Sequence, residues 1–293
     1  MKIALLLCGQ TRTFLDKRVL NLQNRFIEFY NLDVFVSTWK NSGVSVYDLF
    51  INNSTEQDDK EISKSDYDHL QNLKSININS FEDFVKNSKD SETKERMKIY
   101  LKTLKKGTST YNPHRFATSY PQLYTMFDAN KLKNNYEKDR GFTYDVVIKS
   151  RPDFVFYDKI DKHFENIKNS VKSINSKPDY YFPNRIFDVM FISNSHNMTK
   201  LTNSYLYFEK LIKLNLYEKF KFNYGNKIES ILAKYNLNFE FLKGLEDYDC
   251  NRILYKNARN HNLIVEDIDK VLGELIKLET LSELDNLIKT KFV

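Results

Sequence analysis

Three charged side chains lie close together near the middle of the chain, where Lys149, Arg151 and Asp153 alternate directly after the apolar segment 146–148. A carboxylate just beyond a buried strand can hold a divalent cation against a diphosphate, and the two cationic side chains could neutralise phosphate oxygens directly. A turn in which Arg151 and Asp153 form a structural salt bridge accounts for the same residues. The spacing therefore predicts either a phosphate site or a salt-bridged turn, and the residue types leave both interpretations open.

A second candidate for anion binding is the turn formed by Gly9, Gln10, Thr11 and Arg12, which follows the apolar segment 3–7. Backbone N–H groups in a turn between a strand and a helix can bind a phosphate or a nucleotide, and Arg12 adds a positive charge. Because Gly9 stands alone, the turn matches neither the Gly-x-Gly-x-x-Gly fingerprint of dinucleotide-binding proteins nor the Walker loop. An ordinary turn with one glycine is the alternative.

Two carboxylates and a tryptophan complete the set of candidate site residues. Asp188 and Glu229 could each act as a general base on an acceptor hydroxyl, although most carboxylates in such positions are surface residues. Trp39, the only tryptophan, ends an apolar segment together with Thr38, where its flat ring could stack on a base or a sugar. A core or rim tryptophan explains the same position equally well.

Several kinds of site lack sequence support. The five histidines show no His-x-x-x-His spacing, and Cys8 and Cys250 form no Cys-x-x-Cys pair, so neither a histidine-built nor a cysteine-built zinc site is expected. No Gly-x-Ser-x-Gly elbow occurs, which removes the common hydrolase interpretation. The net charge of +6 could suit a polyanionic partner, but no nucleic-acid-binding module accompanies it, and we expect no nucleic-acid partner.

The N-terminal segment has the pattern of a strand, a helix and a second strand. Residues 3–7 are a continuous apolar run, typical of a strand buried on both faces of a parallel sheet, and residues 33–39 predict a second strand. Between them, apolar residues recur at helical spacing, at Leu15, Val19, Leu22, Phe26 and Phe29. Because such units have right-handed crossovers, we expect the two strands to be parallel.

The charged motif at residues 149–153 is predicted to follow a helix and a short strand. Apolar spacing predicts a helix from 119 to about 137, with Pro121 in its first turn. Strands are predicted at 146–148 and 154–156, and the proline between them forbids a helix. The motif is therefore expected at the carboxyl end of a central strand, the edge at which open α/β sheets bind ligands.

The rest of the chain predicts an insertion, a second half of the sheet and a C-terminal helical extension. Residues 52–118 are polar and predict loops and short helices without a core strand. Strands are expected at 180–182, 188–193 and 239–242, and helices at 198–212 and 228–235. Residues 246–293 predict helices, with one stripe at Ile268, Val271, Leu275 and Leu278 and a capping box at 280–283. The fold class is α/β, with one main domain at 1–245.

Five short segments, in this order, resemble a broad family of glycosyltransferase-like proteins found in bacterial surface-polysaccharide loci and in some large DNA viruses and phages. The matching segments are residues 3–14, 33–39, 129–137, 144–153 and 188–198, within a stretch of about 1–245. The resemblance implies a GT-A-like, Rossmann-like mixed sheet that binds a nucleotide sugar of the UDP or GDP type. It also implies a strand-end motif that does the work of an Asp-x-Asp metal clamp.

The resemblance implies that the two turns and the end of the second strand bind the donor, through Gly9, Gln10, Thr11, Arg12, Thr38, Trp39, Lys149, Arg151 and Asp153. This sequence departs from the metal clamp, because Arg151 stands where the first aspartate would be and Asp153 is left alone. Either Asp153 binds Mn²⁺ or Mg²⁺ with help from the diphosphate and water, or Lys149 and Arg151 replace part of the charge of the cation.

The implied activity is transfer of a sugar to a surface glycan of the capsule or lipopolysaccharide type, or to its lipid-linked precursor. If the anomeric centre inverts, a carboxylate deprotonates the acceptor hydroxyl, with Asp188 as the first candidate and Glu229 as the second. The alternative is a non-catalytic module on the same fold that binds a nucleotide or a glycan. The sequence lacks a spanning segment and a secretory signal, so we expect a cytoplasmic protein whose C-terminal helices could contact a membrane surface.

Overall fold

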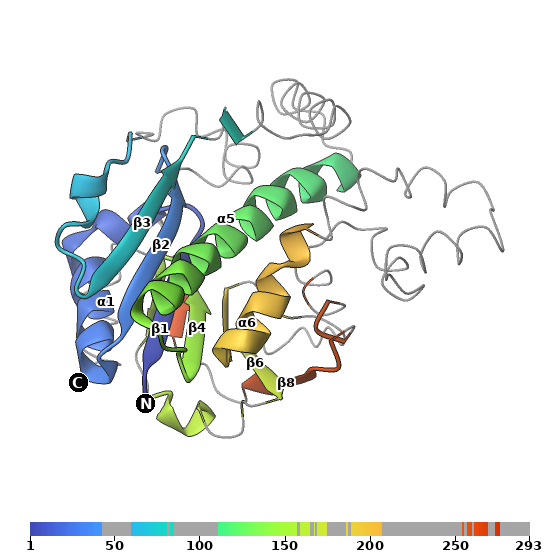
Figure 1. Cartoon of the computed structure of the whole chain (residues 1–293). Coiled ribbons are helices and arrows are strands. Elements are labelled where there is room, and N and C mark those ends of the chain that lie inside the picture. Colours follow the sequence, from blue (N-terminus) through green and yellow to red (C-terminus); the bar gives the residue numbers. More distant parts are fainter. Residues whose placement is uncertain are drawn as a thin grey trace.

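The computed structural model places a central sheet between helices that cover its two faces (Figure 1). The structure describes residues 1–42, 60–80, 83–84, 111–156, 159–164, 167, 169–174, 186, 189–206, 254, 257–259, 261–268 and 273–275. Several predictions lie outside the described residues, namely the strands at 180–182 and 239–242, the helix at 228–235, the capping box at 280–283, Asp188 and Glu229.

Seven strands form one mixed sheet in the order β3-β2-β1-β4-β7-β6-β8. The strands β3, β2, β1 and β4 run parallel, β7 runs antiparallel to both of its neighbours, and β8 pairs in parallel with β6. Their bounds are β1 Ile3–Cys8, β2 Asp33–Trp39, β3 Leu73–Asn79, β4 Val146–Ser150, β6 Ser170–Ile174, β7 Met190–Ser193 and β8 Ile264–Ile268. A separate antiparallel pair consists of β5 (Phe154–Phe156) and β9 (Gly273–Leu275).

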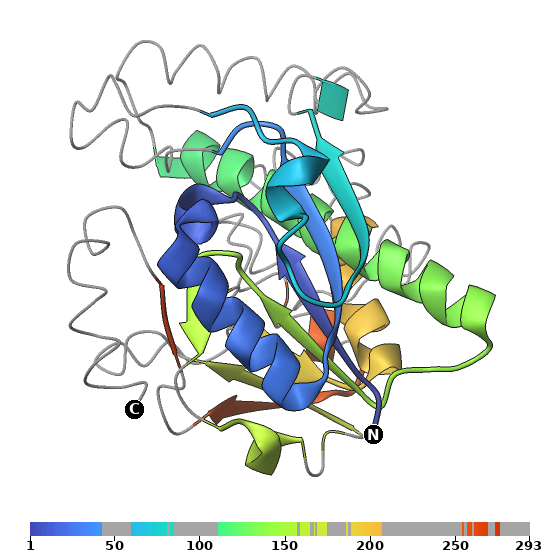
Figure 2. The same ribbon diagram turned by 90° about the vertical axis from the view of Figure 1, so that its left-hand side faces the viewer.

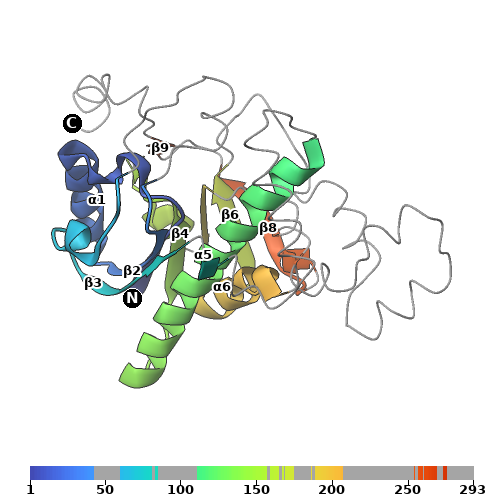
Figure 3. The same cartoon turned by 90° about the horizontal axis from the view of Figure 1, so that it is seen from above.

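Helices pack on both faces of this sheet. One face carries α1 (Lys17–Tyr30), and the other carries α5 (Tyr111–Arg140) and α6 (Ser195–Thr202), as the view from above shows (Figure 3). Figure 2 looks onto α1 with strands of the sheet behind it. Short 3-10 helices lie at Arg12–Leu15, Lys64–Tyr67 and Asp161–His163.

The first strand is buried along its whole length because helices cover both of its faces. Side chains alternate between the two faces, and Ile3, Leu5 and Leu7 join the apolar cluster beneath α1. In the same cluster the rings of Phe26 and Phe156 stack with their centroids 3.9 Å apart. This contact joins α1 to β5, the strand that follows the charged motif.

The boundaries of α1 follow from its end residues. The Asp16 side chain caps the helix by accepting a hydrogen bond from the N–H of Arg18, and Asn31 ends it in the left-handed conformation, with φ 48°. The helix joins β1 to β2, which are parallel neighbours in the sheet. The predicted strand–helix–strand unit is therefore confirmed.

The prediction that residues 52–118 hold no core strand is wrong. In this segment β3 pairs in parallel with β2 and forms one edge of the sheet, where its residues are mostly half-buried. Ile76 and Ile78 pack against the apolar cluster beneath α1, whereas Asn77 and Asn79 donate hydrogen bonds to Asp128 of α5. Two polar residues of this edge strand are thus the ones that bind the helix.

The helix predicted from 119 to about 137 is confirmed within α5, but its predicted start is wrong, and so is a helical stripe predicted in the C-terminal segment. Because α5 begins at Tyr111, Pro121 lies in the helix interior, where it removes one backbone hydrogen bond from a helix that packs along β1, β2 and β3. In the C-terminal segment, Ile268 belongs to β8 and Leu275 to β9, so these two residues of the predicted helical stripe lie in strands, whereas Val271 and Leu278 are outside the described residues. A short apolar pattern does not distinguish a strand from a helix, and here the edge of β6 supplies a parallel partner.

Candidate functional site

The turns after β1 and β4 lie side by side at the carboxyl edge of the sheet, because these parallel strands are direct neighbours. The order of the strands reverses between them, since β2 and β3 extend the sheet on one side of β1 while β4 begins the other side. Ligands of open α/β sheets bind in the crevice at such a switch point. The two sequence motifs with phosphate-binding character therefore meet at one place.

Arg12, Arg151 and Asp153 form one hydrogen-bonded group at this edge, called here the arginine cluster. Arg151 donates from Nε to Asp153 Oδ1 at 2.9 Å and from Nη2 to Oδ2 at 2.7 Å. Arg12 donates from Nη1 to the same Oδ2 at 3.3 Å and from Nε to Gln10 Oε1 at 3.3 Å. One carboxylate thus orients two guanidinium groups that come from different strand ends, and the predicted salt bridge between Arg151 and Asp153 is present.

The arginine cluster exposes its positive groups and buries its negative one. The Asp153 side chain is 0% exposed, whereas those of Arg151 and Arg12 are 19% and 23% exposed. Burial alone would raise the pKa of Asp153, but attraction and hydrogen bonding by Arg151, with attraction by Arg12, outweigh it and hold the pKa below its ordinary value. At neutral pH the three residues therefore carry two positive charges and one negative charge.

The backbone of the first turn is held in an uncommon conformation. Gly9 has φ 114°, a value that favours glycine, and Arg12 lies in the left-handed region with φ 44°. The N–H of Gly9 donates to the carbonyl of Ser37 at 3.1 Å, and that of Arg12 donates to the carbonyl of Ser42 at 2.9 Å. These bonds connect the turn to β2 and to the segment after it, so the strained backbone is fixed by its surroundings.

A buried glutamine of α1 supports the second turn. The Gln23 side chain donates from Nε2 to the carbonyl of Pro152 at 3.3 Å and to that of Phe154, and Phe154 N–H closes the turn on Arg151 O at 3.2 Å. The sequence analysis missed this residue. Its signal is a polar side chain on the apolar face of a helix, one turn after Val19.

Thr11 and Thr38, both predicted to bind a donor, belong to a buried chain of hydroxyl groups. Thr11 Oγ1 lies 3.0 Å from Thr38 Oγ1 and 2.9 Å from the hydroxyl of Tyr67. Burial raises the pKa of Tyr67 to about 12, so this phenol stays protonated at neutral pH. These hydrogen-bonded hydroxyl groups connect the turn after β1 to the end of β2. The role of Tyr67 was not predicted from the sequence.

Trp39 occupies the core position that was one of its two predicted alternatives. Trp39 is 6% exposed, and its ring packs near those of Phe84 and Tyr124, with centroid distances of 5.4 Å and 5.8 Å. An aromatic group at this depth supports the end of β2 rather than offering an open face to a ligand.

Lys149 lies within β4, because the strand continues to Ser150, two residues beyond its predicted end. Its side chain is fully buried on the face of the sheet opposite to α1, with Nζ 5.7 Å from the centroid of the Phe191 ring. Burial raises the pKa of the nearby Cys8 thiol to about 12, and the charge of Lys149 opposes that shift. Lys149 was expected to be displayed beyond the strand, and the structure instead buries it beneath the helices.

The residues around Asp153 do not fit a divalent cation. Both carboxylate oxygens already accept hydrogen bonds from guanidinium groups, and the side chain is fully buried. Within the described part of the chain, no group of three or more His, Cys, Asp or Glu side chains is arranged to hold a metal ion. The predicted role of Asp153 as a metal ligand therefore has no support in this geometry.

A second buried carboxylate, Asp128, joins α5 to the sheet beside the candidate edge. It accepts hydrogen bonds from Ser37 Oγ at 2.7 Å, from Asn77 Nδ2 at 3.0 Å and from Asn79 Nδ2 at 3.3 Å. Asn79 also accepts from the hydroxyl of Tyr124 at 3.2 Å. Because neutral donors surround Asp128, this group has the composition of a structural network rather than of an ion site.

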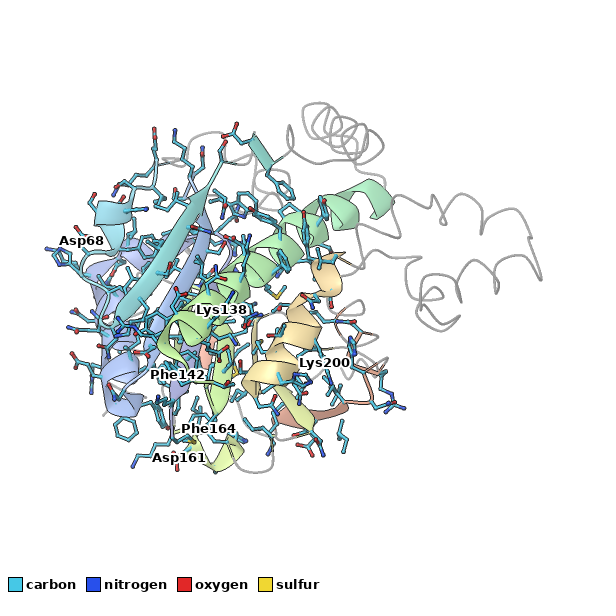
Figure 4. The ribbon with its side chains drawn as sticks, viewed as in Figure 1. Asp68, Lys138, Phe142, Asp161, Phe164 and Lys200 are labelled. Carbon is cyan, nitrogen blue, oxygen red and sulfur yellow. The ribbon has the colours of Figure 1, made fainter. Side chains whose placement is uncertain are left out.

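A third polar group lies near the C-terminal end of α5, which Lys138 and Phe142 mark in Figure 4. Lys133 Nζ donates to Glu137 Oε2 at 3.0 Å and to the hydroxyl of Ser195, and that hydroxyl donates to Glu137 Oε1 at 2.7 Å. Burial lowers the pKa of Lys133, and the charge of Glu137 opposes the shift. All three side chains are buried, and they connect α5 to the start of α6.

No protein-family model matches the chain, and a search of curated proteins found no match either. Among the described residues, no helix combines the length and the apolar character that crossing a membrane requires.

Proposed function

We propose that the protein is a nucleotide-sugar-dependent glycosyltransferase with a GT-A-like fold, and that its donor binds at the arginine cluster. The observation that carries the proposal is the meeting of Arg12 and Arg151, which come from two strand ends, at the switch point of the sheet. Binding at this edge is general for open α/β sheets. The mixed sheet agrees with the fold class that the sequence resemblance implies.

The chemical task of such an enzyme is to stabilise a nucleoside diphosphate as it leaves. When the bond between the anomeric carbon and the donor oxygen breaks, negative charge develops on the diphosphate, and positive groups already in place lower the barrier. Arg12 and Arg151 supply such groups, because Asp153 holds both guanidiniums in place. A carboxylate would take the proton of the acceptor hydroxyl, and Asp188 and Glu229 remain the candidates for that role.

The substrate classes follow from the resemblance of the five sequence segments. We propose a UDP-type or GDP-type sugar as the donor. The proposed acceptor is a surface glycan of the capsule or lipopolysaccharide type, or its lipid-linked precursor, met in the cytoplasm or at the membrane surface facing it.

A non-catalytic nucleotide-binding or glycan-binding module is the second candidate, and one observation favours it. The carboxylate within the arginine cluster, Asp153, is buried and paired with two arginines, so it is not available as a base or a metal ligand. The two candidates share the binding step and differ in turnover.

Thermal melting with UDP-, GDP- and CMP-sugars tests the shared step, because a ligand that binds only the native state raises the melting midpoint. We expect one nucleotide class to raise the midpoint of the wild type and of Arg140→Ala, but not that of Arg151→Ala. Arg140 is a suitable control because it lies at the far end of α5 and is exposed. Release of free nucleoside diphosphate from the same donor then separates a transferase from a binding module. No shift with any nucleotide sugar would contradict both candidates.

A further inference from the structure

We infer that the arginine cluster binds the diphosphate of the donor without a divalent cation, and that Asp153 is a positioning residue for the two guanidinium groups. The inference rests on the proposed function and departs from the metal clamp that the family resemblance implies. It is carried by the contacts, burial and charge of three residues, Arg12, Arg151 and Asp153.

Both carboxylate oxygens of Asp153 already accept hydrogen bonds from arginine side chains. Its Oδ1 accepts from Arg151 Nε, and its Oδ2 accepts from Arg151 Nη2 and from Arg12 Nη1. Paired, charge-assisted hydrogen bonds between arginine and a carboxylate are among the strong ones in proteins. Because the Asp153 side chain is also 0% exposed, a cation that reached either oxygen would lie out of water and beside two positive charges.

The positive and negative side chains of the arginine cluster differ in their exposure to solvent. The negative member of the cluster is fully buried, whereas about a fifth of each arginine side chain is exposed. An ion that arrives from solvent therefore meets the guanidiniums first. Because their two positive charges exceed the one negative charge behind them, the cluster attracts an anion and repels a cation.

The shape of the arginine cluster suits a particular class of ligand. Guanidinium groups suit phosphate oxygens because each carries five N–H donors in one plane. Two guanidiniums that one carboxylate holds at neighbouring strand ends match two linked phosphates. Beside the cluster, no described atom other than those of Gly9 and its two chain neighbours lies within 4 Å of the point where a Cβ of Gly9 would stand, which leaves room for a phosphate to approach the backbone. The ligand class is a diphosphate, either free pyrophosphate or that of a nucleotide.

Hydrogen bonds within the protein hold both turns, the one after β1 and the one after β4, in place. The left-handed conformation of Arg12 is held by the bond from its N–H to Ser42 O, and Gln23 holds the carbonyls of the turn that carries Asp153. A preorganised pair of cations avoids much of the ordering cost of binding. It can thus do the neutralising work for which other sites use a metal ion.

The test is calorimetric titration of the full chain with pyrophosphate, UDP and GDP, first in EDTA and then with Mn²⁺. We expect binding of at least one of these anions in EDTA, with no requirement for Mn²⁺. Arg12→Lys and Arg151→Lys keep the charge but lose the fork, and each should weaken that binding by roughly tenfold or more. Arg140→Lys is the matched control and should bind like the wild type.

The outcomes separate this inference from the proposed function. Binding in EDTA that both lysine variants weaken supports the inference. Binding that needs Mn²⁺ and is lost in Asp153→Asn overturns the inference and leaves the proposed function standing. Binding in EDTA that neither lysine variant weakens also overturns it, since the anion then lies elsewhere. No binding of pyrophosphate, UDP or GDP, together with no melting shift by any nucleotide sugar, overturns both.

Discussion

Replacing Asp153 with asparagine is expected to lower the free energy of unfolding by about 2–3 kcal/mol at pH 7. Removing one partner of a fully buried ion pair costs roughly 3–5 kcal/mol, because the remaining charge is left uncompensated. The loss here should fall below that range, since Arg151 and Arg12 are 19% and 23% exposed and water can solvate part of their charge. The amide of asparagine can also still accept one guanidinium hydrogen bond.

Urea unfolding followed by tryptophan fluorescence measures this change directly. Trp39 is the only tryptophan and is 6% exposed, so its emission reports exposure of the end of β2. Asp16→Asn is the matched control. Asp16 makes the same paired contact with Arg18, at 3.0 Å for both hydrogen bonds, but the two side chains are 22% and 34% exposed. Asparagine preserves the helix cap there, so the control should lose less than about 1 kcal/mol.

The dependence on pH gives the same prediction a second readout. The folded pKa of Asp153 lies below its unfolded value, so the carboxylate stabilises the fold above the unfolded pKa of about 3.9 and loses that effect as the pH falls through the folded pKa. The gap between wild type and Asp153→Asn should stay constant from about pH 7 to pH 5 and narrow only below about pH 4. A loss no larger than that of Asp16→Asn, or a gap that narrows at neutral pH, would refute the reasoning.

Three further substitutions test other buried polar groups, each by urea unfolding. Gln23→Leu should lower the free energy of unfolding by about 1–2 kcal/mol, because two turn carbonyls lose a donor. The loss is limited because the substitution also removes the buried Gln23 Oε1, which has no hydrogen-bond partner among the described residues. An unchanged stability would contradict the supporting role of Gln23. Lys133→Ala should cost about 3 kcal/mol or more, since it removes the cationic partner of a buried glutamate, and adding Glu137→Gln should recover part of the loss; equal loss in both variants would count against the ion pair. Asp128→Asn should lower the free energy of unfolding by about 2 kcal/mol, because the NH₂ group of the amide would face donors whose hydrogen bonds the carboxylate now accepts. An unchanged stability would contradict the role of this network.

The strands next to the site, β1, β2 and β4, were predictable from the sequence. Residues 3–7 are a continuous apolar run, which indicates a strand covered on both faces, and residues 33–39 have the composition of a strand. In the structure β1 is buried throughout and β2 is buried from Val34 to Trp39. The parallel pairing of β1 with β4 then brings the turns at Arg12 and Arg151 to one edge. That both arginines bind Asp153 could be seen only in the structure, because no local sequence pattern relates Arg12 to Asp153, which lies 141 positions further along the chain.

The remaining errors have physical causes in particular residues. Asn77 and Asn79 concealed β3, since an edge strand can use its second face to bind a helix through polar groups. Lys149 was misplaced because the end of β4 is set by backbone pairing with β7 rather than by its last apolar residue. The strand β8 was missed because a five-residue pattern carries little periodicity and the partner strand decides its structure.

The central claim is that a nucleotide diphosphate binds at the edge between β1 and β4. A crystal structure of the protein with the nucleotide that raises its melting midpoint, grown with Mn²⁺ present, tests this claim most directly. We expect diphosphate oxygens within hydrogen-bond distance of the guanidiniums of Arg12 and Arg151, with Asp153 still bound to both. A nucleotide bound away from this edge, or a metal ion on Asp153 with the arginines displaced, would contradict it.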